Sequence, residues 1–213
     1  KTISYLKEYE KISPQVLRND MYILGLSYYQ TKNFANAAAY LSKATTDNDE
    51  MTENAYMHIG NAYIKLNDKN NARLTYEASL RSNFNKKVRE EALYNYALTT
   101  YETTTAFGES ITAFEQLLSE FPNSKYTDKA YDYLASVYMT SKNYEAAYQS
   151  ILKIKNPNST LLEARQYLLY QIGTEAFTQN NQTKAIEYFT LSLQSSTVGK
   201  YSAESYFWRS ESY

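Results

Sequence analysis

The chain has 213 residues, with 22 basic and 23 acidic side chains and no cysteine, which excludes a basic field for nucleic acid, disulfides and cysteine-ligated metal sites. Five Gly and three Pro are too few for the turns of a many-stranded β fold, while 43% hydrophobic residues suffice for a core, so an all-α fold is predicted. No apolar run approaches the roughly 18 residues that are needed to span a membrane, so no membrane-spanning helix is expected.

Along the chain, the predicted elements form an internal repeat. A leading helix at 1–12 is followed by copies at 18–52, 53–90, 91–127, 128–165 and 166–202, and by a partial copy at 203–213. Each copy has a marker slot, occupied in turn by Gly25, Gly60, Leu98, Ala135, Gly173 and Ser210. A second slot holds Ala37, Ala72, Ser110, Ala147 and Ala185. Because only Leu98 is large, both slots are interpreted as tight contacts between helices.

These residues resemble the tetratricopeptide repeat (TPR), a helix–turn–helix unit of about 34 residues. The marker spacings here are 35, 38, 37, 38 and 37, so the additional residues are assigned to loops between copies. The resemblance implies a right-handed α-α superhelix of about five repeats with a flanking helix at each end. A single solenoid over 1–213 is expected.

Polar residues mark the predicted turns and helix starts. Asn33, Asp68, Asn143 and Asn181 share the turn position between the two helices of a copy, where a residue that tolerates the left-handed conformation suits a tight reversal. The run Asp47-Asn48-Asp49-Glu50 lacks the glycine and closing glutamate of a calcium loop, so Asp49 or Thr52 is interpreted as a helix cap. Thr160-Leu-Leu-Glu163 has the pattern of a capping box.

In the TPR family the first helix of each unit lines a concave groove. That geometry, carried over by resemblance, assigns the groove to Tyr22, Leu26, Tyr29, Met57, Asn61, Asn95, Thr99, Asp132, Ser136, Tyr167, Tyr170, Thr174, Phe177 and Phe207. Exposed aromatic side chains are the anchors that peptide or helical partners use. Tyr167, Tyr170 and Phe177 are the first anchors to test.

The sequence offers little for catalysis. His58 is the only histidine, no phosphate-binding glycine loop is present, and no cofactor or metal is expected. We therefore expect a non-catalytic scaffold that binds a peptide or helical segment. Two alternatives stay open: a sensor or regulatory module of a longer protein with a catalytic or DNA-binding domain, and glycan or peptidoglycan binding by the groove aromatics. Self-association through exposed ends of the solenoid is a further expectation.

Two family comparisons refine this hypothesis. Of the five residues with which some TPR modules clamp a chaperone carboxylate, Asn61 and Lys129 match, while Met57, Tyr96 and Tyr133 occupy the other slots, so chaperone tails are disfavoured. The stretch Phe121–Tyr126 looks like repeat boundaries in bacterial envelope members, which favours the periplasm or cell envelope over the cytoplasm. The helical pattern that begins at Thr2 and stops at Tyr213 suggests a fragment of a longer chain.

Overall fold

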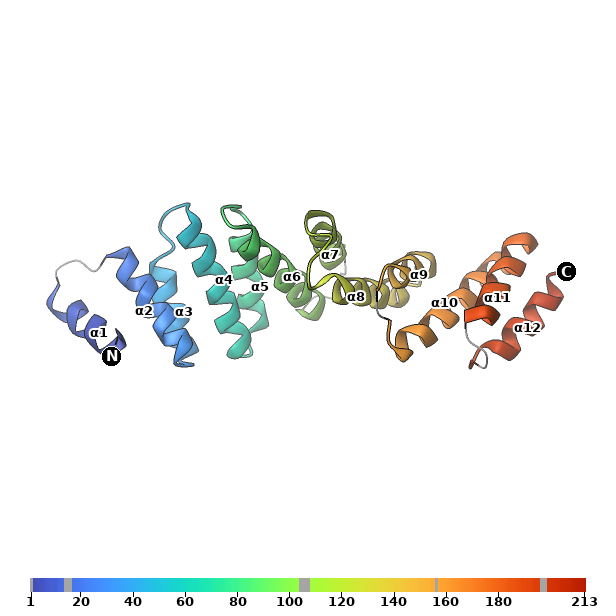
Figure 1. Ribbon diagram of the computed structural model, residues 1–213, viewed down its shortest axis with the longest axis horizontal. Coiled ribbons are helices and arrows are strands. Elements are labelled where there is room, and N and C mark those ends of the chain that lie inside the picture. Colours follow the sequence, from blue (N-terminus) through green and yellow to red (C-terminus); the bar gives the residue numbers. More distant parts are fainter. Residues whose placement is uncertain (1, 14–16, 104–107, 156, 196–198) are drawn as a thin grey trace. The chain divides into compact units, whose positions relative to one another are not determined.

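The computed structural model describes residues 2–13, 17–103, 108–155, 157–195 and 199–213 (Figure 1). Over these residues the chain forms twelve α-helices and no β-strand, which confirms the all-α prediction. Five helix pairs, from α2/α3 to α10/α11, are flanked by α1 and α12, as the predicted fold class requires.

The helices divide into two compact units on either side of the Pro122–Asn123 bond. The first unit contains α1 (Thr2–Ile12), α2 (Arg18–Gln30), α3 (Phe34–Lys43), α4 (Glu50–Lys65), α5 (Lys69–Ser79), α6 (Lys86–Thr103) and α7 (Gly108–Glu120). The second contains α8 (Thr127–Thr140), α9 (Tyr144–Leu152), α10 (Ser159–Thr178), α11 (Gln182–Ser195) and α12 (Ser202–Glu211). Inside each unit every helix packs against the next one along the chain. A single solenoid with the repeat limits given above stays a prediction.

The two small-residue slots are tight helix contacts, as predicted. A methyl group on Gly60 would come within 2.5 Å of the Tyr76 ring, and one on Gly25 within 2.6 Å of Leu41 Cγ. In each copy the large side chain lies 16 residues after the marker slot and the second small slot lies 12 after it. These pairs are all buried: Ala37 and Leu41, Ala72 and Tyr76, Ser110 and Phe114, Ala147 and Ile151, Ala185 and Phe189.

The turns inside the copies differ from the prediction by one residue. The left-handed residue precedes the predicted one, with φ of 61° at Lys32 and 60° at Lys142, and the same holds for Asn67 and Asn180. Asn33 has φ −89° and is instead the N-cap of α3, where its side chain accepts the Asn36 N–H. The Asn33 N–H also bonds the Tyr28 carbonyl, which closes the end of α2 as a Schellman motif. Asn33 therefore closes the C-terminal end of α2 with its backbone N–H and caps the N-terminus of α3 with its side chain.

A polar side chain seven residues before the marker slot ties a copy to the loop that leads to the next copy. The slot holds Arg18, Glu53, Asp128 and Gln166. The buried Glu53 carboxylate accepts the Asn85 N–H at 2.8 Å, and Asp128 accepts the Lys155 N–H at 3.2 Å. In the third copy the slot holds Glu91, and Arg89 pairs instead with Glu120 at 2.7 Å.

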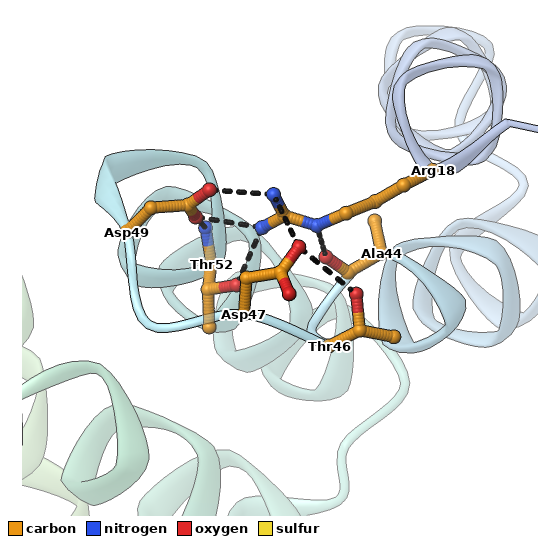
Figure 2. A network of polar contacts seen from close by, with 6 residues as sticks. All are labelled: Arg18, Ala44, Thr46, Asp47, Asp49 and Thr52. Atoms are coloured by element: carbon orange, nitrogen blue, oxygen red, sulfur yellow. Dashed lines mark hydrogen bonds and ion pairs between the residues drawn. The ribbon is translucent and has the colours of Figure 1, made fainter.

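Figure 2 shows the Arg18 member of this set. The guanidinium donates to both carboxylate oxygens of Asp49, at 2.5 and 2.6 Å, to the Ala44 carbonyl at the end of α3, and to Thr52 Oγ1 at 2.7 Å. It also lies 3.1 Å from Asp47. Asp49 is the N-cap of α4, which confirms the cap prediction. The α10 capping box is wrong, because Asn158 caps that helix and Thr160 lies inside it.

Candidate functional site

In the first unit, the groove residues predicted on α2 are half-buried against α4. Tyr22, Leu26 and Tyr29 pack on the apolar cluster shared by α3 and α4. The Tyr22 hydroxyl donates to Asn54 Oδ1 at 2.9 Å, and the Tyr29 ring meets the His58 ring edge-on at 5.4 Å. Burial raises the pKa of both tyrosines, which keeps the hydroxyls neutral. Both rings are therefore only partly available to a partner.

Two of the residues assigned to the groove do not reach it. Met57 and Thr99 are 6% and 2% exposed, so their side chains pack in the core and cannot contact a partner. Asn61 and Asn95 are half-buried, and the Asn95 amide nitrogen lies 3.5 Å from Asn61 Oδ1. Asn61 Oδ1 also accepts the Tyr76 hydroxyl at 2.6 Å. The side chains of Asn61 and Asn95 thus form hydrogen bonds within the chain, which leaves fewer of their polar atoms for a partner.

In the second unit, two adjoining hollows bring several predicted residues together. One, of about 320 Å³, is lined by Asp132 and Ser136 of α8 and by the first residues of α10. The other, of about 650 Å³, is lined by Tyr167 of α10 and by Tyr201. Both are open, and they share Met139, Thr160 and Ala164. The two hollows together are called the α8/α10 groove below.

An aromatic run borders the larger hollow. The Tyr167 ring lies 6.1 Å from Tyr144 and 5.2 Å from Tyr201, and Tyr201 stacks on Tyr170 at 5.5 Å. The Tyr170 ring also lies 6.1 Å from Phe189. Tyr167 and Tyr170 are therefore half-buried and held from several sides, which leaves them less free than the anchor hypothesis assumed.

The other predicted residues of the second unit lie apart from the α8/α10 groove. Phe177 packs against Trp208 at 5.2 Å and is half-buried. The Thr174 hydroxyl donates to the Tyr170 carbonyl within its own helix. Phe207 on α12 is 55% exposed. The structure thus brings Asp132, Ser136 and Tyr167 to one place and leaves Phe177 and Phe207 at another.

The charges around the α8/α10 groove are of both signs. Glu163 and Lys200 line the larger hollow, and partial burial raises the pKa of Asp132 in the smaller one. Burial also raises the pKa of Tyr167, with a smaller contribution from its hydrogen bond with Tyr144. A carboxylate whose solvation is already reduced gains more from a cationic or hydrogen-bonding ligand group than a fully hydrated one does.

Sequence reasoning missed Tyr201, Lys200 and Leu162 as lining residues. Tyr201 precedes the partial copy, so the repeat register gave it no face, although it is the N-cap residue of α12 and touches two predicted anchors. Leu162 was taken into a capping motif, yet its side chain is exposed at the rim. A leucine in the first turn of the helix, outside the two small-residue slots, was the available sequence signal.

The described residues contain no group of three or more His, Asp or Glu side chains placed to hold a metal ion. None of their helices has the length and apolar character needed to cross a bilayer. His58 is partly buried, its Nδ1 atom has no hydrogen-bond partner, and burial lowers its pKa.

The chain matches the family described as outer membrane lipoprotein, YfiO, over residues 14–150. It is similar to the C-terminal part of a TPR repeat-containing protein from Cytophaga hutchinsonii, with 16% identity, a TM-score of 0.50, and coverage of 90% of this chain and 69% of that one.

A second solved structure, BtubC from P. vanneervenii, is 13% identical with a TM-score of 0.50, covering 91% of this chain and 86% of that one. At such identities both likenesses show the fold alone. No curated protein sequence matches the chain. Because the family match spans more than half of the 213 residues, the chain is a TPR-type protein that belongs to the YfiO family of outer membrane lipoproteins.

Proposed function

We propose that this protein is a non-catalytic scaffold that binds a peptide or helical segment of a partner protein through the α8/α10 groove. The observation that carries the proposal is the pair of adjoining hollows, about 650 and 320 Å³, in which apolar and aromatic side chains alternate with polar and charged ones such as Asp132, Glu163 and Lys200. Concave apolar surfaces with a few polar groups are the usual form of a binding site.

The shape of the site favours a chain segment over a compact small molecule. The two hollows are open and follow each other along α10, so successive side chains of one segment can fill them. Membership of a family of outer membrane lipoproteins supports a place in the bacterial cell envelope for this scaffold.

The experiment selects peptides from a random display library on the parent chain and re-tests them on Ser136→Trp. Ser136 is exposed and lines the smaller hollow, so the indole blocks the groove without entering the core. The matched control is Gln149→Trp on the exposed face of α9. Peptides that bind the parent and Gln149→Trp but bind Ser136→Trp at least about tenfold more weakly support the proposal.

A library that yields no binder sensitive to Ser136→Trp contradicts it. A glycan array is run beside the library on the same three proteins. Glycan binding that disappears in Ser136→Trp, without any peptide binding, would assign the groove to carbohydrate and replace the proposal.

A further inference from the structure

The two hollows of the α8/α10 groove differ in charge. Glu163 and Lys200, which have opposite signs, both line the larger hollow. Among the described residues that line the smaller hollow, Asp132 is the only charged one. The groove therefore has an excess of one negative charge, and this charge lies on α8.

The Asp132 carboxylate is not neutralised within the chain. It forms no ion pair or hydrogen bond with any residue that the structure describes. The side chain is exposed, yet its surroundings remove part of its hydration and raise the pKa of the carboxyl. A carboxylate with reduced solvation and no cationic partner gains from a ligand that supplies a positive charge.

The rest of the smaller hollow suits the stem of a basic side chain. Lys and Arg pack their methylene groups on apolar surface while the charged group reaches a polar partner. Ser136 lies one turn after Asp132 on the same face of α8, so its hydroxyl adds a hydrogen-bond acceptor beside the carboxylate. The apolar residues that line this hollow are Ala135, Met139, Ile151, Leu161 and Ala164.

The larger hollow suits an apolar side chain next to the basic one. Leu162, which is 42% exposed, and the half-buried rings of Tyr167 and Tyr201 line it. A charged partner group of either sign would meet both an attractive and a repulsive residue there, Glu163 and Lys200. The two hollows share part of their lining, so they can receive side chains two residues apart in an extended segment or three to four apart in a helix.

We propose that the α8/α10 groove is specific for segments that carry a lysine or arginine beside a large apolar residue, and that Asp132 selects the basic side chain. The inference rests on the proposed function, because it names the chemistry of the partner segment for the same groove. The basic group pairs with the carboxylate, its stem covers the apolar lining, and the apolar residue fills the larger hollow. An acidic or uncharged segment would leave the carboxylate without a partner.

The peptides that the random display library yields on the parent chain give the first test. Those that bind Ser136→Trp at least about tenfold more weakly are the groove-binding peptides. They should share a Lys or Arg at one position, with a large apolar residue two to four positions away. Groove-binding peptides without a shared basic residue overturn this inference and leave the proposed function in place. A library without any peptide sensitive to Ser136→Trp overturns both.

Affinity measurements with one groove-binding peptide identify the partner of its basic residue. Asp132→Lys should weaken binding by at least about tenfold, because repulsion replaces attraction. Glu175→Lys is the matched control: it makes the same change in net charge on an exposed residue of α10 that lines neither hollow, and should bind like the parent. Equal affinities for these two variants overturn the inference, since only the net charge would then matter.

Two further measurements separate the charge of Asp132 from the fold. Asp132→Asn keeps the shape of the side chain, so it should melt like the parent by circular dichroism and weaken binding by about two- to fivefold, the usual contribution of an exposed ion pair. A peptide with Glu in place of the shared basic residue should bind Asp132→Lys more tightly than it binds the parent. If the exchanged pair does not recover affinity, the basic residue has another partner and the inference is wrong.

Discussion

The carboxylate of Glu53 is buried, and its Oε2 atom accepts the backbone N–H of Asn85, 32 residues later, at 2.8 Å. Its other oxygen accepts the Phe84 N–H at 3.2 Å. One side chain on α4 thus fixes the loop that leads to α6, and both of its oxygens are used.

Glu53→Ala should therefore lower the free energy of unfolding by about 1–3 kcal/mol, because two partly buried backbone donors lose the buried carboxylate that accepts from them. Denaturant unfolding measures this. Glu8→Ala makes the same change on an exposed residue of α1 in the same unit, and as the control it should stay within about 0.5 kcal/mol. A Glu53 variant no less stable than its control would show that the loop is fixed by other contacts.

Ala147 should not tolerate a larger side chain. It is fully buried at the second small slot of α9, so Ala147→Leu should cost about 1–3 kcal/mol through overpacking. Gln149→Leu introduces leucine on the exposed face of the same helix and should reduce the free energy of unfolding much less. Equal denaturation midpoints for the two variants would contradict the assignment of the tight contact.

Lys142 should be sensitive to backbone preference although its side chain is exposed. Its φ is 60°, a conformation that glycine adopts freely and β-branched residues resist. Lys142→Gly should be at least as stable as the parent, and Lys142→Val less stable than Lys142→Gly by about 1–2 kcal/mol. Thermal melts of both variants decide this, and identical melts would argue against a left-handed residue here.

The Arg18–Asp49 pair should contribute less to stability in acid. The Arg18 guanidinium, and then the Thr52 backbone N–H, lower the pKa of the Asp49 carboxyl well below its usual range. A depressed pKa gives stability that is present above the unfolded pKa of about 3.9 and is lost as the pH falls further. The stability difference between the parent and Asp49→Asn should be constant from pH 7 to 5, since asparagine keeps the cap, and shrink below about pH 4. A difference unchanged down to pH 2 would rule out the ion pair as its source.

Tyr170→Ala should lower the melting temperature, whereas truncation of an aromatic side chain that contacts only a partner would leave it unchanged. Its ring packs on Tyr201 and Phe189, so truncation removes contacts between α10, α11 and the start of α12. Phe207→Ala, on an exposed aromatic of α12, is the control and should melt close to the parent. If Tyr170→Ala melts like the parent, the ring does not stabilise the fold and Tyr170 is again a candidate anchor for a partner.

The sequence could predict the helix pairs because their contacts have a strict spacing. A small residue at Ala37 and a large one at Leu41 recur in every copy, and such a pattern has one structural explanation. The turns were predicted one residue too far along, because Asn33 tolerates a left-handed conformation as well as it caps a helix, and residue type alone does not separate the two roles.

The candidate site was less predictable than the fold. Family geometry assigns a face to each residue, and three residues that it assigns to the groove, Asp132, Ser136 and Tyr167, line the two adjoining hollows. It could not show that Met57 is covered by Val88 and Ala92, because that depends on how closely two helices approach. Tyr201 lies at the end of the fifth copy, after its second helix, where the repeat register assigns no face.

The fixed offsets of 12 and 16 residues have a consequence for how this chain can change in length. An insertion between the two helices of a copy would move the large side chain away from its small partner, so the turns at Lys32 and Lys142 cannot lengthen. The loops between copies have no such constraint, and the marker spacing there varies from 35 to 38. Insertions, tags and fused domains are therefore best placed in these loops, as between Ala44 and Asp49, provided that the polar side chain which holds the loop keeps its partner.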